Sequence, residues 1–307
     1  MSKSYPAHGG RHYAIQETPP AADTSFVSRK FLNIRYAFLS AAQMLDIYLP
    51  ESGEGPYPVI MHIHGGAFMG CDKADLQVLP ALQGLKRGYA VVAVNYRLSG
   101  EARFPALVHD VKAAVRWVRA NAGRYQLDPD GIAAWGGSAG GYLASMLGAS
   151  FGVPELEDLS LGNPGQLCRV QAVVVWYGPT NFLKMDEQLA ESGLLAPEGM
   201  RHNDPYSPEA LLLGRRITRL PNRVAAANPE SYIRENAAPF FIQHGTLDAV
   251  VPVQQSIELA EKLVRSMGPG SVKLELLEGA GHADPRFETS ENVGKVLDFL
   301  DGYLKKG

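Results

Sequence analysis

Short apolar runs recur along the chain and alternate with segments in which apolar residues return every three or four positions. Runs such as VVAV within 89–95 and AVVV within 170–177 are continuously apolar, which is typical of strands covered on both faces of a mostly parallel sheet. The pattern predicts eight strands: 31–38, 44–49, 57–64, 89–95, 131–135, 170–177, 240–244 and 272–277.

Helical periodicity falls between these runs. The segment 105–122 begins with a proline and then carries apolar residues along one face, so it predicts an amphipathic helix. Further helices are predicted at 138–147, 253–264 and 292–304. Strands and helices that alternate over most of the chain indicate one doubly wound α/β sheet.

Two segments stand apart from this alternation. Residues 1–29 show no periodicity and are expected to form an irregular N-terminal arm, which leaves 30–307 as a single α/β domain. Residues 178–238 contain no convincing strand, and their patterns at 182–190, 208–213 and 229–234 predict short helices. A structureless loop of this length is uncommon in a compact domain, so we expect an inserted helical cap over one end of the sheet.

The composition excludes several classes of protein. The 307 residues are 46% apolar and 20% charged, which excludes an intrinsically disordered chain. Lys and Arg total 29 against 32 Asp and Glu, so no cationic excess exists to bind nucleic acid or an acidic membrane. No apolar run reaches the ~18 residues of a membrane span, and no secretory signal is visible, so we expect a cytoplasmic protein. Cys71 and Cys168 are too few for a disulfide scaffold and are expected to be free buried thiols, with a single bridge as the alternative.

The strongest chemical signal is WGGSAGG at 135–141, which follows a predicted strand and precedes a helix rich in small residues. Within it, Gly136-x-Ser138-x-Gly140 has the spacing of a nucleophile elbow, in which a serine sits on a strained turn between strand and helix. Glycine is needed on both flanks because a Cβ there would collide with the neighbouring strand and helix. The alternatives are a plain glycine turn or a phosphate loop, but Ser138 occupies the second glycine position of G-x-G-x-x-G and no Walker lysine follows.

A second signal lies at the end of the strand predicted at 57–64, where the chain reads HIHGGAF. An H-G-G run after this strand supplies backbone N–H groups to a developing oxyanion in lipases and esterases. The alternatives are a plain glycine turn or a metal pair formed by His62 and His64, which share one strand face. Zinc would need a third ligand, and no other cluster has suitable spacing, so we expect no metal. We interpret His64 as a brace for the loop and His62 as a core residue.

A serine nucleophile needs a base, and the base needs a carboxylate to orient it. His282 is the best candidate base because it lies in the glycine-flanked loop EGAGH just after the last predicted strand. Asp248 follows the preceding strand in HGTLDAVVP, although it would also suit an ordinary loop, and Asp284 is too close to His282 to orient it easily. The order Ser138, Asp248, His282 is that of α/β hydrolases. The other histidines outside the HIHGGAF segment are in less suitable places: the arm (His8, His12), a helix (His109), the cap (His202) and a strand end (His244, expected to be structural).

These motifs in combination resemble those of the α/β-hydrolase esterases of the hormone-sensitive-lipase-like class. Within that class the resemblance is closest to the group related to bifunctional acetylxylan/feruloyl esterases. It extends from about Leu45 to Leu304 and rests on these segments: LDIYLP, HIHGGAF, VNYRLS, FPALVHDVKAAVRWVRANA, WGGSAGG, WYGPTNF, PFFIQHGTLDAVVPVQQS and LLEGAGHADPRF.

The resemblance implies an α/β-hydrolase fold and a role for each residue of the site. Ser138 would be the nucleophile of a serine carboxylesterase, with Asp248 and His282 as its partners. The backbone N–H groups of the oxyanion hole would come from Gly66, Ala67 and Ala139. The chain departs from the family pattern at Ala67, which replaces the usual third glycine and places a methyl group near the acyl pocket.

Such a site would hydrolyse small-molecule esters through an acyl-enzyme intermediate, without a cofactor. The resemblance implies short acyl groups, including acetyl and feruloyl esters of plant carbohydrates. The substrate pocket is expected to include the following aromatic residues, which would either stack on a feruloyl ring or a sugar or form an apolar wall: Phe68, Trp176, Tyr177 and Phe182.

Two alternative functions follow from the same residues. A peptidase of the prolyl-oligopeptidase type shares the late HGxxDxxVP and GxxH pattern, but the short arm cannot supply its large N-terminal domain. A catalytically inactive binding protein of this fold would be expected to have lost a triad residue or an oxyanion glycine, and the sequence retains them. Nothing in the sequence predicts an oligomeric state.

Overall fold

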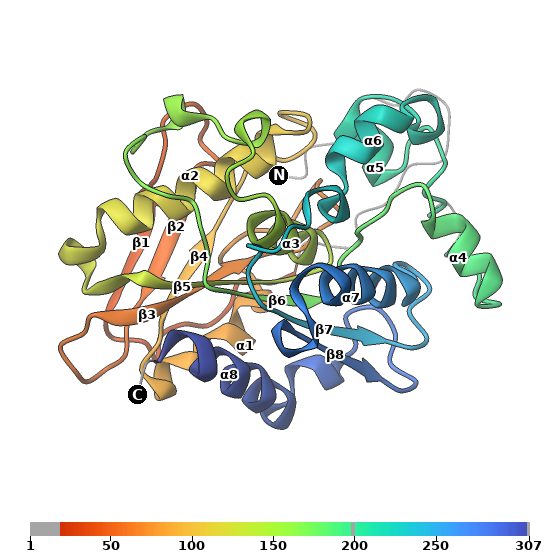
Figure 1. The fold of residues 1–307 in the computed structure, drawn as a ribbon. Coiled ribbons are helices and arrows are strands. Elements are labelled where there is room, and N and C mark those ends of the chain that lie inside the picture. The colour runs from red at the N-terminus through yellow and green to blue at the C-terminus, as the bar shows by residue number, and fades with distance from the viewer. Residues whose placement is uncertain (1–18, 198–199, 306–307) are drawn as a thin grey trace.

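Eight strands form one sheet with helices on both faces (Figure 1). The computed structural model describes residues 19–197 and 200–305. Most of the predicted N-terminal arm, including His8 and His12, therefore lies outside the described residues. The rest of the arm runs beside residues 74–76, where Ala21 forms an isolated β-bridge with Asp75.

All eight predicted strands are present, and their limits differ from the predicted ones by a few residues. They are β1 (Lys30–Arg35), β2 (Met44–Tyr48), β3 (Tyr57–Ile63), β4 (Ala90–Val94), β5 (Leu127–Gly137), β6 (Ala172–Trp176), β7 (Phe240–Gly245) and β8 (Val272–Leu277). Their spatial order is β1-β2-β4-β3-β5-β6-β7-β8. Strand β2 is antiparallel to both of its neighbours, and the pairings from β4 to β8 are parallel. The doubly wound, mostly parallel sheet is thus confirmed.

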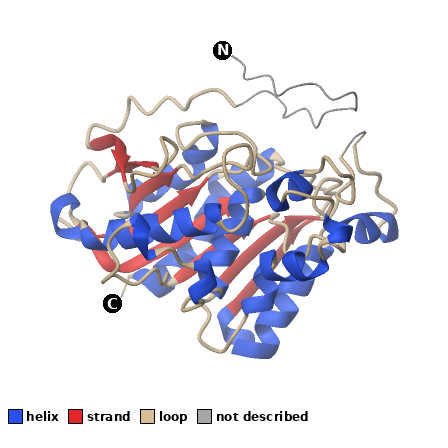
Figure 2. Ribbon diagram, turned by 90° about the horizontal axis from the view of Figure 1, so that it is seen from above, coloured by secondary structure: helices blue, strands red, loops and turns tan. Residues whose placement is uncertain are grey.

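Helices cover the two faces of the sheet unequally (Figures 1 and 2). On one face lie α2 (Ala106–Ala120), α3 (Ala139–Ala149) and α7 (Gln254–Met267), and on the other lie α1 (Leu79–Leu82) and α8 (Ser290–Leu304). Each face has its own apolar core because successive side chains of a strand point to opposite sides. In β6, for example, Val173 and Val175 belong to the first core, whereas Val174 and Trp176 belong to the second.

Helix α1 and the 3₁₀ turns η1 (Leu76–Val78) and η2 (Gln83–Arg87) around it were not predicted. Pro80 and Gly84 interrupt the helical periodicity there, so no single helix of ordinary length can form. The segment nevertheless packs closely on the sheet, since a Cβ on Gly84 would lie 2.7 Å from Cδ1 of Ile60.

Residues 178–238 fold into short helices, as predicted. They are α4 (Met185–Glu191), α5 (Pro208–Leu213) and α6 (Pro221–Ala227), together with the 3₁₀ turns η6 (Ile217–Arg219) and η7 (Pro229–Tyr232). Helix α5 begins where predicted because the Ser207 hydroxyl caps it and Pro208 occupies its first position. Helix α6 was missed, because its sequence PNRVAAA has no extended apolar stripe.

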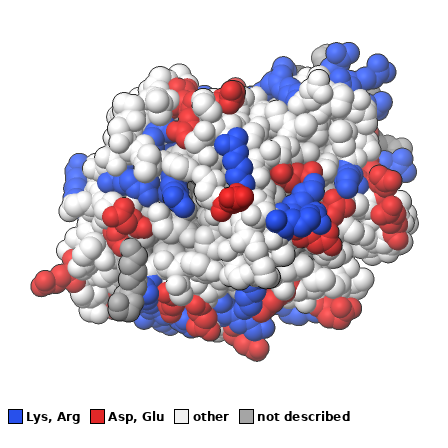
Figure 3. Space-filling view, in the orientation of Figure 1, with Lys and Arg blue, Asp and Glu red and all other residues white. Residues whose placement is uncertain are grey.

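The helices, the surface charges and the two cysteines bear on the expectations drawn from composition. Among the described residues, no helix combines the length and the apolar composition that crossing a membrane requires. Acidic and basic side chains are interspersed over the face shown in Figure 3. Cys71 and Cys168 are both free, but only Cys168 is buried, because Cys71 lies in the partly open loop after β3.

Candidate active site

Ser138 lies at the sharp turn between β5 and α3. Its backbone torsions, φ 55° and ψ −123°, belong to a region that an L-residue occupies only under constraint. The Ser138 N–H donates to the carbonyl of Trp176 at 2.9 Å, and α3 begins at the next residue, Ala139. The hydroxyl is therefore held at the carboxyl end of the sheet, next to the N-terminus of a helix.

The glycines on either side of Ser138 are required by close backbone contacts. A Cβ on Gly140 would lie 2.0 Å from the carbonyl oxygen of Ile63, and one on Gly136 would lie 2.4 Å from the backbone of Gly140. Strand β3 and helix α3 approach so closely here that no side chain fits between them. These contacts confirm the steric reason for the glycines that the sequence indicated.

A continuous hydrogen-bonded chain joins the serine, a histidine and an aspartate. The Oγ atom of Ser138 lies 3.0 Å from Nε2 of His282, and Nδ1 of His282 lies 2.7 Å from Oδ2 of Asp248. A carboxylate only accepts, so Nδ1 carries the proton and Nε2 is the acceptor for the serine hydroxyl. The structure thus brings together three residues that are far apart in the sequence, in the arrangement of a nucleophile, a base and an orienting acid.

Asp248 is fully buried, and both of its oxygens are engaged. Oδ1 accepts the N–H groups of Val250 and Val251, each at 2.8 Å. Oδ2 accepts from His282 and lies 3.2 Å from Nε2 of His244. Burial would raise the pKa of Asp248, but the charge and hydrogen bonds of the two imidazoles hold that pKa well below its usual range. The carboxylate therefore stays ionised and can orient His282.

His244 is closer to the site than the sequence indicated. It was expected to be structural, and it is fully buried, with Nδ1 2.6 Å from the hydroxyl of Ser256 and Nε2 2.8 Å from the carbonyl of Val251. The carbonyl requires a proton on Nε2, which therefore also points toward Asp248. The i, i+4 spacing of His244 and Asp248 was the available signal for this contact.

The HIHGGAF segment forms a tight loop after β3. Gly66 has φ 108°, and a Cβ there would lie 2.3 Å from the carbonyl oxygen of Gly70, so only glycine fits. Ala67 has φ 53°, a left-handed conformation that explains why glycine is usual at this position in the family that the sequence resembles. The Gly65 N–H donates to the side chain of Gln77 at 2.7 Å. Among the described residues, the N–H groups of Gly66, Ala67 and Ala139 have no hydrogen-bond partner.

His64 supports this loop through hydrogen bonds and a ring contact, as predicted. It is buried, its Nδ1 lies 2.7 Å from the Gly65 carbonyl oxygen, and its ring stacks on Tyr96 with centroids 4.5 Å apart. The Tyr96 hydroxyl in turn donates to the His64 carbonyl at 3.0 Å. The loop is therefore connected to the core by hydrogen bonds and by a ring contact.

A cavity of about 40 Å³ opens beside Ser138. The HIHGGAF loop, the start of α3, residues 178–238 and the loop after Asp248 all contribute to its wall. The lining residues are Ala67, Phe68, Ser138, Ala139, Pro179, Met200, His202, Pro208, Glu209, Val250 and Val251. Its walls are mostly apolar.

The model of the BD-FAE family matches residues 45–263. The chain belongs to this family. The matched segment includes Ser138 and Asp248 and ends before His282, which is brought to them by the fold. The membership confirms the resemblance to hormone-sensitive-lipase-like esterases, and the sheet order with its flanking helices confirms an α/β-hydrolase fold.

Several named relatives of this BD-FAE chain are esterases. Esterase LipC of Mycobacterium tuberculosis is 30% identical over 88% of this chain and 64% of its own length. The truncated form of a carbohydrate esterase from gut microbiota is 31% identical, with a TM-score of 0.82, over 94% of this chain and 100% of its own. The bifunctional GH43-CE of Bacteroides eggerthii is 35% identical, with a TM-score of 0.79, over 89% of this chain and 35% of its own. The chain spans between about half and two thirds of the length of three curated Mycobacterium tuberculosis relatives that it matches.

The predicted aromatic residues of the BD-FAE site fall in different places. Phe68 lines the cavity, and the Tyr177 ring meets that of His282 edge-on with centroids 4.8 Å apart. Phe182 is fully buried behind Phe68, 6.1 Å from it between ring centroids. Trp176 points to the opposite face of the sheet, where its Nε1 donates to Gln243, because the alternation along β6 turns it away from Ser138. Of these four residues the structure thus places Phe68 in the wall of the cavity and leaves Trp176, Tyr177 and Phe182 outside it.

His62 occupies the core, as interpreted from the sequence. Its side chain is buried, and burial first, then the neighbouring His64, lowers the pKa of His62 to about 3. Within residues 19–197 and 200–305, no three His, Cys, Asp or Glu side chains are grouped so that they could hold a metal ion.

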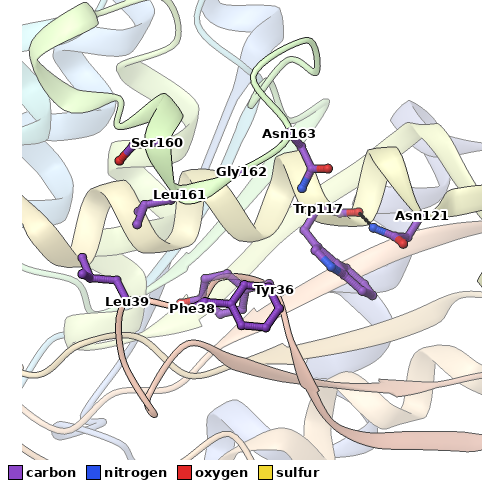
Figure 4. Close-up of a pocket in the computed structure, with 9 residues that line it drawn as sticks. All are labelled: Tyr36, Phe38, Leu39, Trp117, Asn121, Ser160, Leu161, Gly162 and Asn163. Atoms are coloured by element: carbon purple, nitrogen blue, oxygen red, sulfur yellow. Dashed lines mark hydrogen bonds between the residues drawn. The ribbon is translucent and has the colours of Figure 1, made fainter.

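A larger cavity, about 650 Å³ in volume, lies away from this site, between α2, the β1–β2 connection and the loop around residue 161 (Figure 4). Its lining residues are Tyr36, Phe38, Leu39, Trp117, Asn121, Ser160, Leu161, Gly162 and Asn163. None of these side chains is a carboxylate, an imidazole or an amine, so this cavity offers no base beside its one serine.

Proposed function

We propose that this protein is a serine carboxylesterase that hydrolyses short acyl esters through an acyl-enzyme intermediate. The observation that carries the proposal is the unbroken chain from Ser138 Oγ to His282 Nε2, at 3.0 Å, and from His282 Nδ1 to Asp248 Oδ2, at 2.7 Å. Membership of a family with esterase relatives supports the same reaction.

In the proposed reaction, His282 removes the proton of Ser138 as Oγ attacks the ester carbonyl. Asp248 keeps the ring in the tautomer that can accept this proton and stabilises the imidazolium that results. His282 then protonates the leaving alcohol. In the deacylation step it activates a water molecule that hydrolyses the acyl-enzyme and releases the carboxylic acid. The low pKa of Asp248 supports this role, because a protonated carboxyl would lose its attraction for the imidazolium.

The oxyanion would be held by the N–H groups of Gly66, Ala67 and Ala139. Ala67 and Ala139 line the cavity together with Ser138, Gly66 precedes Ala67, and among the described residues none of the three N–H groups donates to an acceptor. Donors placed in advance for the developing charge contribute about 10²–10³ each to the rate.

The cavity beside Ser138 supports short acyl groups as substrates. Its volume is about 40 Å³, and the methyl group of Ala67 forms part of its wall. The cavity is lined mainly by apolar side chains, so we propose short acyl esters, acetyl esters among them, as substrates. The carbohydrate-esterase names of two structural relatives support acetylated carbohydrate fragments as natural substrates. A cytoplasmic location stays a prediction.

Hydrolysis of p-nitrophenyl acetate by the wild type and by Ser138→Ala tests the proposal. The variant should lose about four to six orders of magnitude in kcat while keeping its fold, because the nucleophile is gone. Ser145→Ala is a matched control: this serine is buried in α3 and binds the Gly141 carbonyl. A Ser138→Ala variant that keeps a tenth of the activity would refute the assignment, and a wild type inactive on every ester but active on a peptide would favour the peptidase alternative.

A further inference from the structure

Two ionisable side chains from the cap meet in the wall of the cavity beside Ser138. His202 and Glu209 both line this cavity, and their side chains are only 3% and 5% exposed. Nδ1 of His202 lies 3.2 Å from Oε1 of Glu209. The proposed acyl transfer uses neither residue, yet a buried ion pair is costly to form, so its place next to the nucleophile calls for an explanation.

The ring of His202 reaches the loop that carries Asp248. Nε2 of His202 donates to the carbonyl of Val250 at 2.8 Å. The N–H of the same residue, Val250, donates to Oδ1 of Asp248 at 2.8 Å. On the other side, the backbone N–H of His202 donates to Asp186 of α4, also at 2.8 Å. A single residue thus links the cap to the carboxylate that orients His282.

The contacts of His202 with Glu209 and Val250 depend on whether the imidazole ring carries one proton or two. Nε2 must carry a proton to donate to the Val250 carbonyl, whereas Nδ1 makes no hydrogen bond but lies 3.2 Å from Oε1 of Glu209, whose charge favours a second proton on the ring. Burial alone would lower the pKa of His202, but the charge of Glu209 and the Val250 carbonyl raise this pKa to about 9. A ring with one proton cannot suit both neighbours: with the proton on Nε2, an Nδ1 lone pair would lie 3.2 Å from the Glu209 carboxylate, and with the proton on Nδ1, a lone pair would face the Val250 carbonyl.

We propose that His202 is a positioning residue of this esterase: as an imidazolium held by Glu209, it fixes Val250 and thereby the loop that presents Asp248 to His282. The inference rests on the proposed triad. In this proposal the cap does more than cover the cavity, because its residue His202 also positions Asp248 for the chemical step.

Substitutions at His202 separate positioning from packing. His202→Leu introduces an apolar side chain of similar size that has no hydrogen-bond donor. In this variant kcat for p-nitrophenyl acetate should fall about 10- to 100-fold, with KM changed much less. His202→Gln retains an N–H donor for Val250 and should restore most of the lost kcat. His109→Leu is the matched control, because His109 also binds a backbone carbonyl, that of Glu155 at 3.2 Å, but does not line the cavity.

The pH profile gives a readout that packing alone would not move. Wild-type kcat should fall as the pH rises through about 9, when the second ring proton is lost. Glu209→Gln removes the charge that holds this proton, so the alkaline fall should begin at lower pH, and in His202→Gln it should disappear. Glu230→Gln is the control, since Glu230 is a cap carboxylate paired with Lys262 outside the cavity. The titratable groups on the elements around the ring are Glu209, Asp186, Asp248, His244 and His282.

An activity-independent measurement keeps the inference separate from the proposed function. The amide resonances of Val250 and Val251 should titrate together with the His202 ring in the wild type and should not do so in His202→Gln. This result would stand even if no ester were hydrolysed. Unchanged kcat and pH profile in both His202→Leu and Glu209→Gln, or amide resonances that do not follow the ring, would overturn the positioning role.

Discussion

Replacing Asp248 with asparagine changes the proton arrangement of the site while leaving its shape intact. Oδ1 accepts two backbone N–H groups, those of Val250 and Val251, so the oxygen of the new side-chain amide must stay at that position. The amide NH₂ then takes the place of Oδ2, which lies 2.7 Å from Nδ1 of His282. Two donors cannot share this contact, so the ring adopts the tautomer in which Nδ1 is the acceptor.

In that tautomer Nε2 of His282 carries the proton and directs it at Oγ of Ser138. The ring can no longer accept the serine proton, and the imidazolium loses its counter-charge. A tautomer reversal of this kind costs about 10⁴ in kcat, or roughly 5 kcal/mol of transition-state stabilisation. The new NH₂ also faces the Nε2–H of His244, which lies 3.2 Å from Oδ2, so the variant should lose about 1–3 kcal/mol of folding free energy as well.

The measurement is kcat for p-nitrophenyl acetate, with urea unfolding to confirm that Asp248→Asn is folded in the assay. Asp284→Asn is the matched control, because Asp284 is two residues from His282 in sequence but pairs with Arg286 instead. The control should keep kcat within about twofold. A folded Asp248→Asn variant that retains more than about one hundredth of wild-type kcat would refute the tautomer argument.

Two further predictions follow from the same site. Ala67→Gly removes a methyl from the cavity wall and relieves the left-handed φ of 53°, so kcat/KM for hexanoyl relative to acetyl esters should rise about tenfold; an unchanged ratio would mean that this methyl does not limit the pocket. The pKa of His202 is raised from 6.5 to about 9, so its ion pair stabilises the fold fully below about pH 6.5 and is lost as the pH rises through 9. Urea unfolding should show a wild-type advantage over His202→Gln that shrinks by about 3 kcal/mol across this range; an advantage independent of pH would contradict the raised pKa.

The sheet and the positions of the three proposed triad residues were predictable because they depend on local signals. Continuous apolar runs mark buried parallel strands, and glycine at Gly136 and Gly140 marks a backbone crossing without room for a side chain. The candidate base and acid follow predicted strands, so the carboxyl ends of those strands bring Asp248 and His282 to one end of the sheet.

The remaining features depend on contacts that no local pattern encodes. Trp176 was assigned to the pocket from its neighbourhood in sequence, but the two-residue repeat of β6 turns its side chain to the far face. His202 contacts Val250, 48 positions away, through a loop without periodicity, and its partner Glu209 lies in the first turn of a helix of six residues. Such contacts depend on how residues 178–238 fold onto the sheet, and the local pattern of a single sequence does not specify that.

The elbow of Ser138 and the loop of His282 belong to strands separated along the sheet, with β6 and β7 between β5 and β8. Ser138 also precedes Asp248 and His282 in the sequence, so the proposed triad cannot assemble during synthesis until β7 and β8 have joined the sheet. Division of the protein in the connection between α3 and β6 would place Ser138 on one fragment and Asp248 and His282 on the other. Neither fragment alone should hydrolyse esters, so ester hydrolysis would measure the association of the two fragments.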